Sequence, residues 1–259
     1  MMRRLAATFA IITLACGVTP AAAERLVVSL SNHRVAVTSS FIGEELVLFG
    51  TIEPDSSSNS LRPPYDLVVT VTGPRQTLRT RRKQRMFGIW VNVDSREFVG
   101  VPSYLAVLSN RPVSDIANQD TLRRLQVGLD YFLLPQRIGP DFADTVRDDP
   151  FRLAFVRLKN QQGLYRESGT AVTFLTPTVF RAAIQMPAAV PTGTYQIEVE
   201  LFASGNLAAR TNTALEVIKT GFEQYVADAA RDNGLLFGMA TALMALLIGW
   251  FASIVFRRD

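Results

Sequence analysis

The sequence contains very few of the side chains on which metal sites and nucleophilic enzymes depend. Its 259 residues include one cysteine, Cys16, and one histidine, His33. A zinc site usually draws on several His or Cys ligands, and a serine or cysteine hydrolase needs a nucleophile beside a positioned base. His33 falls between two predicted strands, where a role on a turn or on the surface of a sheet is expected. We therefore expect no catalytic residue, no metal and no cofactor, and a protein that is not an enzyme.

Motifs for phosphate binding and for paired-carboxylate chemistry are also missing. Gly73 and Gly88 are isolated glycines, so the sequence has no glycine-rich loop that could cradle a phosphate. Asp148 and Asp149 could act as a carboxylate pair, but they directly precede Pro150. An acidic cap followed by proline is typical of the start of a helix, and we favour capping over chemistry for this pair.

No large excess of charge of one sign is present. The chain has 27 basic and 23 acidic side chains, a net charge of +4, and four of the arginines are Arg3, Arg4, Arg257 and Arg258 at its two ends. The part between the ends is therefore close to neutral. This balance argues against a nucleic-acid-binding surface over the whole protein.

A long uncharged run dominates the C-terminal end of the chain. Leu235 to Phe256 is 22 residues without one charged side chain. A helix of this length spans about 33 Å, enough for a hydrocarbon core of about 30 Å. We predict a transmembrane helix over residues 235–256. Arg257 and Arg258 follow it, and the positive-inside rule then places the tail, residues 257–259, in the cytoplasm.

The N-terminus has the pattern of an export signal. Arg3 and Arg4 precede a short apolar segment, Leu5 to Leu14, and Ala21-Ala22-Ala23 offers a small-residue cleavage site. We predict a signal peptide over residues 1–23, whose removal takes the one cysteine away and leaves no disulfide. An uncleaved second helix and a lipid anchor on the cysteine are the alternatives. The C-terminal helix is then the single span of a bacterial inner-membrane protein, with the bulk of the chain in the periplasm.

Residues 24–219 show the short, turn-bounded strands of a β-rich domain. Strands are expected at Arg25–Leu30, Arg34–Thr38, Glu45–Ile52, Asp66–Thr72, Thr77–Arg82, Phe87–Val93, Ala171–Leu175, Val179–Met186, Tyr195–Leu201 and Leu207–Ile218. A helical insertion is expected at about 112–162, and residues 220–234 are predicted as a juxtamembrane amphipathic helix. We predict an immunoglobulin-like two-sheet sandwich with a helical insertion. Two separate small β modules are the alternative.

Two groups of residues are candidates for binding. The first is a dense cluster of cations followed by an aromatic residue, which could bind an anion, anionic lipid or an acidic partner; a solvated hairpin edge that prevents aggregation is the alternative. Its members are Arg79, Arg81, Arg82, Lys83, Arg85 and Trp90. The second is a set of small residues at helical spacing in the predicted span, which would let another helix approach closely. These are Gly238, Ala242, Ala245, Gly249 and Ala252, and a chance pattern in an alanine-rich helix is the alternative.

Several short segments, in order, resemble a transmembrane protein family of alphaproteobacteria. They are Phe41-Ile42-Gly43, Leu48-Phe49-Gly50, Gly88-Ile89-Trp90-Val91-Asn92, Leu158-Lys159, Gly163-Leu164-Tyr165-Arg166-Glu167, Pro191-Thr192-Gly193-Thr194-Tyr195 and Phe256-Arg257-Arg258. The resemblance implies a single-span inner-membrane protein, often encoded beside a permease of the TauE/SafE type, and it transfers no catalytic residue.

Three functions remain open at this point. The first is a non-enzymatic, membrane-anchored periplasmic accessory or scaffold protein that partners a TauE/SafE-type transporter or associates with itself through the span. The second is a periplasmic anion-binding sensor. The third, which rests on fold analogy alone, is an assembly factor for a membrane complex.

Overall fold

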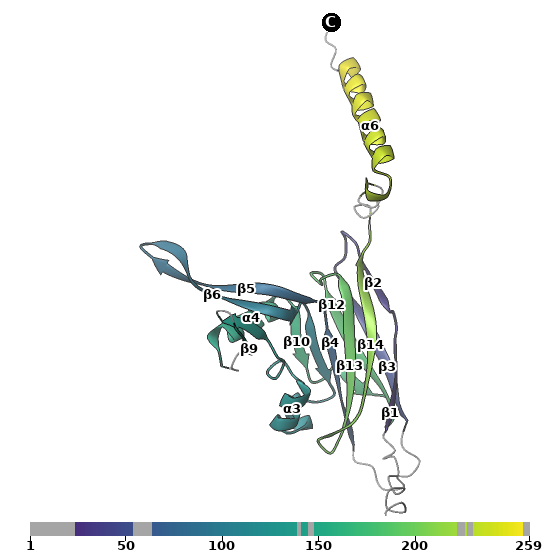
Figure 1. Cartoon of the computed structure of the whole chain (residues 1–259). Helices are drawn as coiled ribbons and strands as arrows, with labels where there is room; N and C mark the ends of the chain where they lie inside the picture. The colour runs from purple at the N-terminus through teal and green to yellow at the C-terminus, as the bar shows by residue number, and fades with distance from the viewer. Residues whose placement is uncertain are drawn as a thin grey trace, which may run out of the picture.

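The computed structural model describes residues 24–53, 64–138, 141–144, 148–221, 226 and 230–255. Within these residues the chain is mainly β, as predicted, and a long apolar helix stands apart from the folded body (Figure 1). The predicted signal peptide, residues 222–225 and 227–229 of the predicted juxtamembrane helix and residues 256–259 lie outside the described residues.

The first sheet of the folded body has four antiparallel strands. In spatial order they are β1 (Arg25–Leu30), β3 (Gly43–Glu53), β12 (Val179–Pro187) and β11 (Val172–Phe174). Gly50 of β3 pairs with Phe180 of β12, and a Cβ atom added at Gly50 would lie 2.3 Å from the Phe180 ring. Glycine at position 50 therefore makes room for the largest core side chain of β12.

The second sheet has six strands. In spatial order they are β10 (Tyr165–Ser168), β7 (Leu105–Ser109), β4 (Tyr65–Thr72), β13 (Gly193–Ala203), β14 (Asn206–Lys219) and β2 (Arg34–Val37). The outer pairs β10–β7 and β14–β2 are parallel, and the inner pairs are antiparallel.

The two sheets enclose one apolar core. Alternate residues of β13, Tyr195 to Leu201, are fully buried and face side chains such as Leu46 and Leu48 of the first sheet. The same cluster runs from Leu26 to Val217 in the sequence, so the N-terminal and C-terminal strands share one core. This confirms a two-sheet sandwich. The immunoglobulin-like topology stays a prediction.

The insertion covers the outer face of the second sheet. Its first two helices are α2 (Val113–Ile116) and α3 (Gln119–Leu125). Ile116 and Leu122 of these helices pack in a second apolar cluster with Val68 of β4 and Val107 of β7. Strands β4 and β7 are therefore buried on both faces, which explains their continuous apolar runs.

A third sheet forms an arm that projects from the sandwich (Figure 1). Its strands are β5 (Arg75–Met86), β6 (Ile89–Pro102), β8 (Pro135–Ile138) and β9 (Asp141–Asp144). Two expectations are corrected here. The insertion is not wholly helical, because β8 and β9 pair at the base of the arm. The strand expected at Phe87–Val93 begins at Ile89 and continues to Pro102, because Phe87 and Gly88 form the turn of a long hairpin.

Helix α4 (Pro150–Gln161) lies beneath the base of the arm. Phe155 of α4 stacks on Phe98 of β6 with ring centroids 4.6 Å apart and meets Tyr165 of β10 edge-on at 5.8 Å. The hydroxyl of Tyr165 donates to the carbonyl oxygen of Pro102 at 2.7 Å. These contacts attach the base of the arm to the second sheet.

Two charged residues of α4 lie on the buried side of the helix, where charged side chains are rare. Arg152 and Lys159 are buried, whereas Leu158 is exposed. The Arg152 guanidinium donates to three carbonyl oxygens of residues 129–132, and Lys159 Nζ donates to the carbonyl oxygen of Ser103 at 3.3 Å. Backbone carbonyl oxygens accept the hydrogen bonds of both cationic groups, which allows them to be buried. The spacing of apolar residues along the helix does not predict this burial.

The apolar helix predicted at the C-terminus is confirmed as α6 (Gly234–Val255). It has the length and composition to cross a membrane over 21 residues, Gly234–Ile254, and no part of that segment is buried against the described chain. The predicted small residues Gly238, Ala242, Ala245, Gly249 and Ala252 all lie in α6. Because α6 is helical throughout, their spacing places them on one side of it.

The cap of α4 gives a direct test of this local structure. Asp149 Oδ1 accepts from the backbone N–H groups of Phe151 at 2.8 Å and Arg152 at 3.0 Å, whereas the side chain of its neighbour Asp148 is exposed. We expect Asp149→Ala to lower the free energy of unfolding by about 0.5–2 kcal/mol, because two N–H groups lose their acceptor. Asp148→Ala is the matched control and should have no measurable effect. Urea unfolding of the full-length protein in detergent measures both, and equal losses would contradict the cap.

Candidate functional site

The candidate site is the hairpin of β5 and β6, residues 75–102, which we call the hairpin arm. Met86 pairs with Ile89, so Phe87 and Gly88 form a two-residue turn, and both have positive φ, 51° and 83°. Such a turn matches the twist of a hairpin but normally holds residues like Asn and Gly. Phe87 therefore occupies a backbone conformation that a bulky side chain rarely adopts.

Strand alternation sorts the arm's charged residues by face. Positions 79, 81, 83 and 85 of β5 are two residues apart and lie on one face of the ribbon, and the pairing of Arg85 with Trp90 brings Trp90 to that face. Both irregularities in the register place the extra residue in β6, so the alternation of β5 is unbroken. Arg82 lies on the other face, in line with Leu78 at the base.

Most of the arm's cations have no acidic partner. Arg79 approaches Glu97 at 3.5 Å, and Arg96 approaches Asp94 at 3.6 Å. Between Arg79 and Val93 the sequence has five cations and no carboxylate. Within the described residues, no ion pair involves Arg81, Arg82, Lys83 or Arg85. The outer half of the arm is therefore strongly positive on a protein whose body is close to neutral.

The end of the arm is apolar and exposed. Phe87 is 100% exposed, Trp90 69% and Ile89 65%, and Met86 and Val91 are also exposed. Burying one such side chain stabilises a protein by about 1.5–3 kcal/mol. Because these side chains are exposed within the described chain, they contribute little of this stabilisation to the fold. An exposed apolar cluster beside a charged one is typical of an interaction surface.

A groove lies between the arm and α4. This cavity has a volume of about 240 Å³, and four cations line it, Arg81, Arg82, Lys83 and Arg157, together with the apolar side chains of Phe151 and Leu158. A mixed lining of this kind could hold a small anion or an anionic headgroup.

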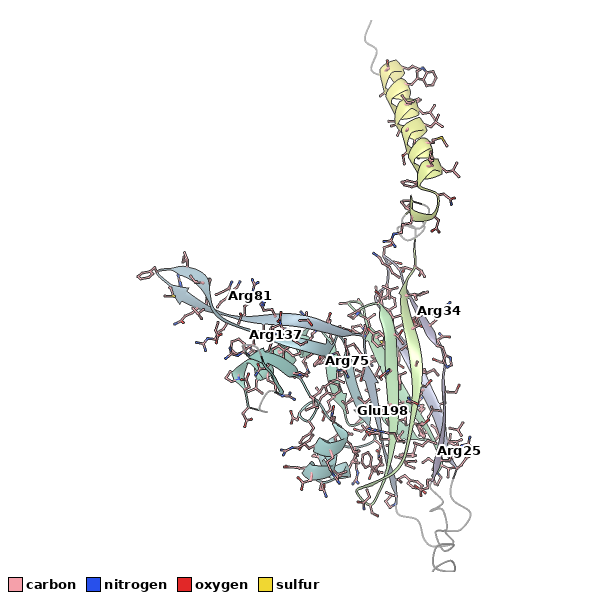
Figure 2. All side chains as sticks on the ribbon, viewed as in Figure 1. Arg25, Arg34, Arg75, Arg81, Arg137 and Glu198 are labelled. Atoms are coloured by element: carbon pink, nitrogen blue, oxygen red, sulfur yellow. The ribbon has the colours of Figure 1, made fainter. Side chains whose placement is uncertain are left out.

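The arm starts at the end of the sandwich from which the chain leaves for α6. Thr72 of β4 pairs with Gln196 of β13, and Gly193, three residues earlier in β13, pairs with Val217 near the end of β14. A Cβ atom added at Gly193 would lie 3.0 Å from Pro74, directly before β5. The base of the arm and the end of β14 are therefore neighbours, and we call this end of the sandwich the anchored end. Figure 2 shows Arg81 on the arm and Arg25 at the opposite end of the sandwich.

A second cavity, of about 280 Å³, lies where strands of the two sheets meet. Its polar lining residues include Glu45, Arg166, Arg181 and Gln185. Arg166 donates a hydrogen bond to the side-chain oxygen of Gln185, so part of this lining is already satisfied within the protein.

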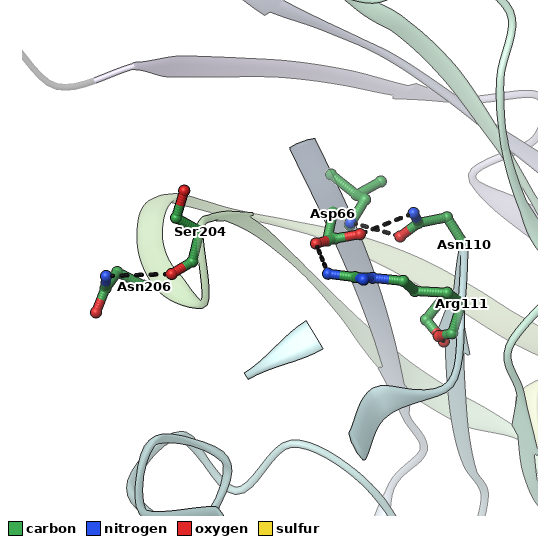
Figure 3. A network of polar contacts seen from close by, with 7 residues as sticks. Asp66, Asn110, Arg111, Ser204 and Asn206 are labelled. Carbon is green, nitrogen blue, oxygen red and sulfur yellow. Dashed lines mark hydrogen bonds and ion pairs between the residues drawn. The ribbon is translucent and has the colours of Figure 1, made fainter. Parts of the chain in front are cut away.

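Other buried polar groups serve the fold. Burial raises the pKa of Tyr104, Tyr165 and Tyr195, and each hydroxyl donates to a backbone carbonyl oxygen. Burial lowers the pKa of Lys159, whose ammonium group lies 5.8 Å from the ring centroid of Tyr165. At the end of the sandwich remote from the anchored end, Asp66 accepts from Asn110 and Arg111 (Figure 3).

Glu200 of β13 is a buried carboxylate beside Arg210 of β14. It is 1% exposed, and its Oε1 accepts from Arg210 Nη2 at 2.6 Å and Nε at 3.1 Å, while Oε2 has no hydrogen-bond partner within the described residues. Burial raises the pKa of Glu200 to about 7, although Arg210 acts in the opposite direction. Glu200 lines neither of the two cavities described above.

The structure assigns a place to each residue that the sequence singled out. The six arm residues are together on β5 and β6, and the five small residues are together on α6, away from the arm. His33 lies in the exposed turn before β2, and Asp149 is a helix cap. No group of three or more His, Cys, Asp or Glu that could hold a metal occurs among the described residues.

Two parts of the site were not predicted from the sequence. The turn residues Phe87 and Gly88 fall within the strand predicted at Phe87–Val93, although glycine is a turn signal. Arg157 of α4 joins the cations of the arm only because α4 packs beneath it, which no local pattern indicates.

Comparison with known proteins supports a membrane protein. A family model described as "Putative transmembrane protein (Alph_Pro_TM)" matches residues 25–258. A search of curated proteins finds no match. Among solved structures, the N-terminal domain of the Streptococcus gordonii adhesin Sgo0707 aligns at 10% identity with a TM-score of 0.28, over 75% of this chain and 32% of that one. This chain thus spans about a third of the adhesin domain, and a likeness at this level carries no functional argument.

The raised pKa of Glu200 predicts a pH-dependent stability. Protonated Glu200 is favoured in the folded state, so its stabilising effect is complete below the unfolded pKa of 4.5 and is lost as pH rises through about 7. We expect unfolding experiments on the full-length protein in detergent to show stability falling over this window, by up to about 3 kcal/mol.

Glu200→Gln should remove this slope, because the amide cannot ionise and its oxygen can still accept from Arg210. The control is Glu216→Gln, which alters an exposed carboxylate that pairs with Arg34 at 3.2 Å, away from Arg210, and should leave the slope unchanged. A slope that persists in Glu200→Gln would assign the pH dependence to another group.

Proposed function

Because the chain belongs to the transmembrane protein family whose model matches residues 25–258, we propose that it is a non-enzymatic accessory or scaffold protein of a membrane transport complex. In this proposal α6 anchors the protein in a bacterial inner membrane, residues 24–219 lie in the periplasm and residues 257–259 lie in the cytoplasm. The hairpin arm is the contact surface beside the membrane.

One observation carries the proposal. At the anchored end of the sandwich, the arm presents four cations without acidic partners in the described chain together with an exposed apolar tip. The core of the sandwich does not need these residues, because the outer half of β5 is exposed from Arg81 to Met86. An exposed apolar tip beside unpaired cations is typical of a surface that makes a contact.

The orientation rests on the sequence at the two ends of the chain. Arg257 and Arg258 follow α6 closely, and basic residues at the end of a span favour the cytoplasmic side. The signal-like N-terminus is consistent with export of the body. A reporter enzyme that is active only in the cytoplasm should be active when fused after Asp259. A reporter that is active only in the periplasm should be inactive there, and its activity would contradict the proposed orientation.

The anchor itself supports a partner within the membrane. Gly238, Ala242, Ala245, Gly249 and Ala252 form one small-residue side of α6, and a Cβ atom added at Gly238 or Gly249 would meet nothing in the described chain. Small residues allow close helix–helix contact in lipid. The family resemblance makes a polytopic permease of the TauE/SafE type the first candidate partner, and self-association through α6 is the alternative.

The groove between the arm and α4 supports a second candidate function. Four cationic residues, Arg81, Arg82, Lys83 and Arg157, are among those that line a cavity of about 240 Å³. An anion-binding sensor module would use this groove. Titration calorimetry with sulfite, sulfate and phosphate tests the idea, and absence of heat with all three anions would remove it.

Cysteine crosslinking tests the scaffold proposal. The one native cysteine, Cys16, lies in the predicted signal peptide, so an introduced cysteine is unique in the mature chain. We expect Gly249→Cys in native membranes to give a discrete adduct that mass spectrometry identifies as a polytopic transport protein or a second copy of this chain. Leu247→Cys, on the opposite side of α6, is the matched control and should give little adduct. Equal labelling from both positions would contradict a specific contact.

Charge reversal tests the arm in the same membranes. Arg81→Glu and Arg85→Glu should reduce co-purification of the captured partner several-fold, because they place carboxylates in the contact. Arg25→Glu changes an equally exposed arginine at the opposite end of the sandwich and should have no effect (Figure 2). Unchanged recovery with the arm variants would exclude the arm from the contact.

A further inference from the structure

We propose that the tip of the hairpin arm inserts into the interface of the same bilayer that holds α6, with the cations of β5 on anionic lipid headgroups. This inference rests on the proposed role of the arm as a contact surface and names the chemistry of what it contacts. It makes the arm a second, reversible membrane attachment that orients the sandwich.

The order of residues along the arm matches the layers of a membrane interface. Phe87, Ile89 and Met86 form the tip, Trp90 and its cross-strand partner Arg85 come next, and Lys83 follows two residues further back, at about 3.3 Å per residue. In an inserted hairpin the apolar tip would reach the acyl boundary, Trp90 would lie at headgroup level and the cations would meet the phosphates. Arg81 and Arg79 lie further back on the same face and would add longer-range attraction to an anionic surface.

The turn residue is the most specific part of this pattern. Phe87 combines a left-handed backbone, φ 51°, with complete exposure of its side chain. Neither the turn nor the described fold benefits from phenylalanine at this position, since Asn is the residue that such a turn prefers. A bulky apolar residue placed there is explained if the surroundings of the tip are themselves apolar.

The position of the arm puts the bilayer within its reach. The arm and the chain leading to α6 both leave from the anchored end. Residues 220–233, which connect β14 to α6, can span at most about 46 Å, and the 12 residues of β5 extend about 40 Å. The tether therefore keeps the anchored end within about 46 Å of the membrane surface, and an arm of about 40 Å can reach that surface when the tether is not fully extended.

A second exposed apolar residue lies at the anchored end. Val37 pairs with Lys219, so the loop after β2 is at this end, and Ile42 in that loop is 91% exposed. A lipid bilayer is wide enough to accept the exposed apolar side chains of both the arm and this loop, whereas the surface of a small acidic protein is not. An acidic protein partner would satisfy the cations but would leave Phe87 and Ile42 in water.

Tryptophan fluorescence can read the position of the tip in the full-length protein. The chain has two tryptophans, Trp90 in the arm and Trp250 in α6, so Trp250→Phe makes Trp90 the sole reporter. This protein is placed in nanodiscs of phosphatidylcholine with or without phosphatidylglycerol, with brominated acyl chains as quencher. We expect Trp90 emission to be roughly halved by the brominated lipid in anionic nanodiscs, because an interfacial tryptophan lies near the upper acyl chains.

The variants separate the two parts of the contact. Phe87→Asn in the Trp250→Phe background keeps or improves the turn and should abolish most of the quenching. Leu175→Asn, which alters an exposed apolar residue at the end of the sandwich opposite the anchored end, is its matched control and should leave the quenching unchanged. Replacing positions 79, 81, 83 and 85 with Gln should remove the difference between anionic and neutral nanodiscs, as should 1 M salt, which shortens the screening length to about 3 Å.

The outcomes distinguish this inference from the function on which it rests. Quenching that appears in neither lipid composition, or that survives Phe87→Asn, overturns insertion of the tip. If insertion fails while Arg85→Glu still releases a partner in native membranes, the occupant of the arm is a protein and the scaffold proposal stands. If both measurements fail, the arm is only a solvated hairpin edge.

Discussion

The aromatic contact between Phe98, Phe155 and Tyr165 is the interaction on which the arrangement of this protein depends. A two-stranded hairpin is at best marginally stable in water, because it has no second layer to bury its apolar face. Here the base of the hairpin has such a layer in α4, and the outer half does not. The stack therefore fixes the base of a segment that would fray on its own, and with it the direction in which the arm leaves the sandwich. Without it, neither the cations nor the exposed tip would have a defined position.

The burial that holds α4 in place also explains its unusual composition. Arg152 and Lys159 lie under the helix, where backbone carbonyls of the insertion and of Ser103 satisfy their N–H groups. The aliphatic parts of both side chains fill space that apolar residues would otherwise occupy. The helix thus packs against the base of the arm with charged residues on its buried side. Leu158, by contrast, lines the groove. Some cations of this protein are buried against backbone carbonyl oxygens, and others are exposed on the arm. A nearly neutral protein can therefore have a strongly positive arm.

Much of the fold follows from local pattern. Alternating strands such as Tyr195–Leu201, the cap at Asp149 and the uncharged helix α6 each depend on neighbouring residues, and each was predicted correctly from the sequence. The parts that were mistaken depend on distant residues. The segment Arg75–Met86 has little apolar alternation, so its full length as a strand becomes visible only through its pairing with β6. Strands β8 and β9 lie in the section that was predicted to be helical. They are strands because β8 pairs with the edge strand β6 of the arm, and this pairing cannot be seen in the local sequence.

The sequence by itself determined that this protein has a membrane-spanning helix, a β-rich body and a dense cluster of cations, because length, apolar periodicity and charge are properties of a continuous stretch of chain. Only the tertiary structure decided where that cluster lies and what accompanies it. The register between β4, β13 and β14 brings the base of the arm to the anchored end, and packing of α4 adds Arg157. These placements arise from burial shared between segments that are far apart in the sequence, β4 with β13 and the arm with α4, and no local pattern records which segments will share it.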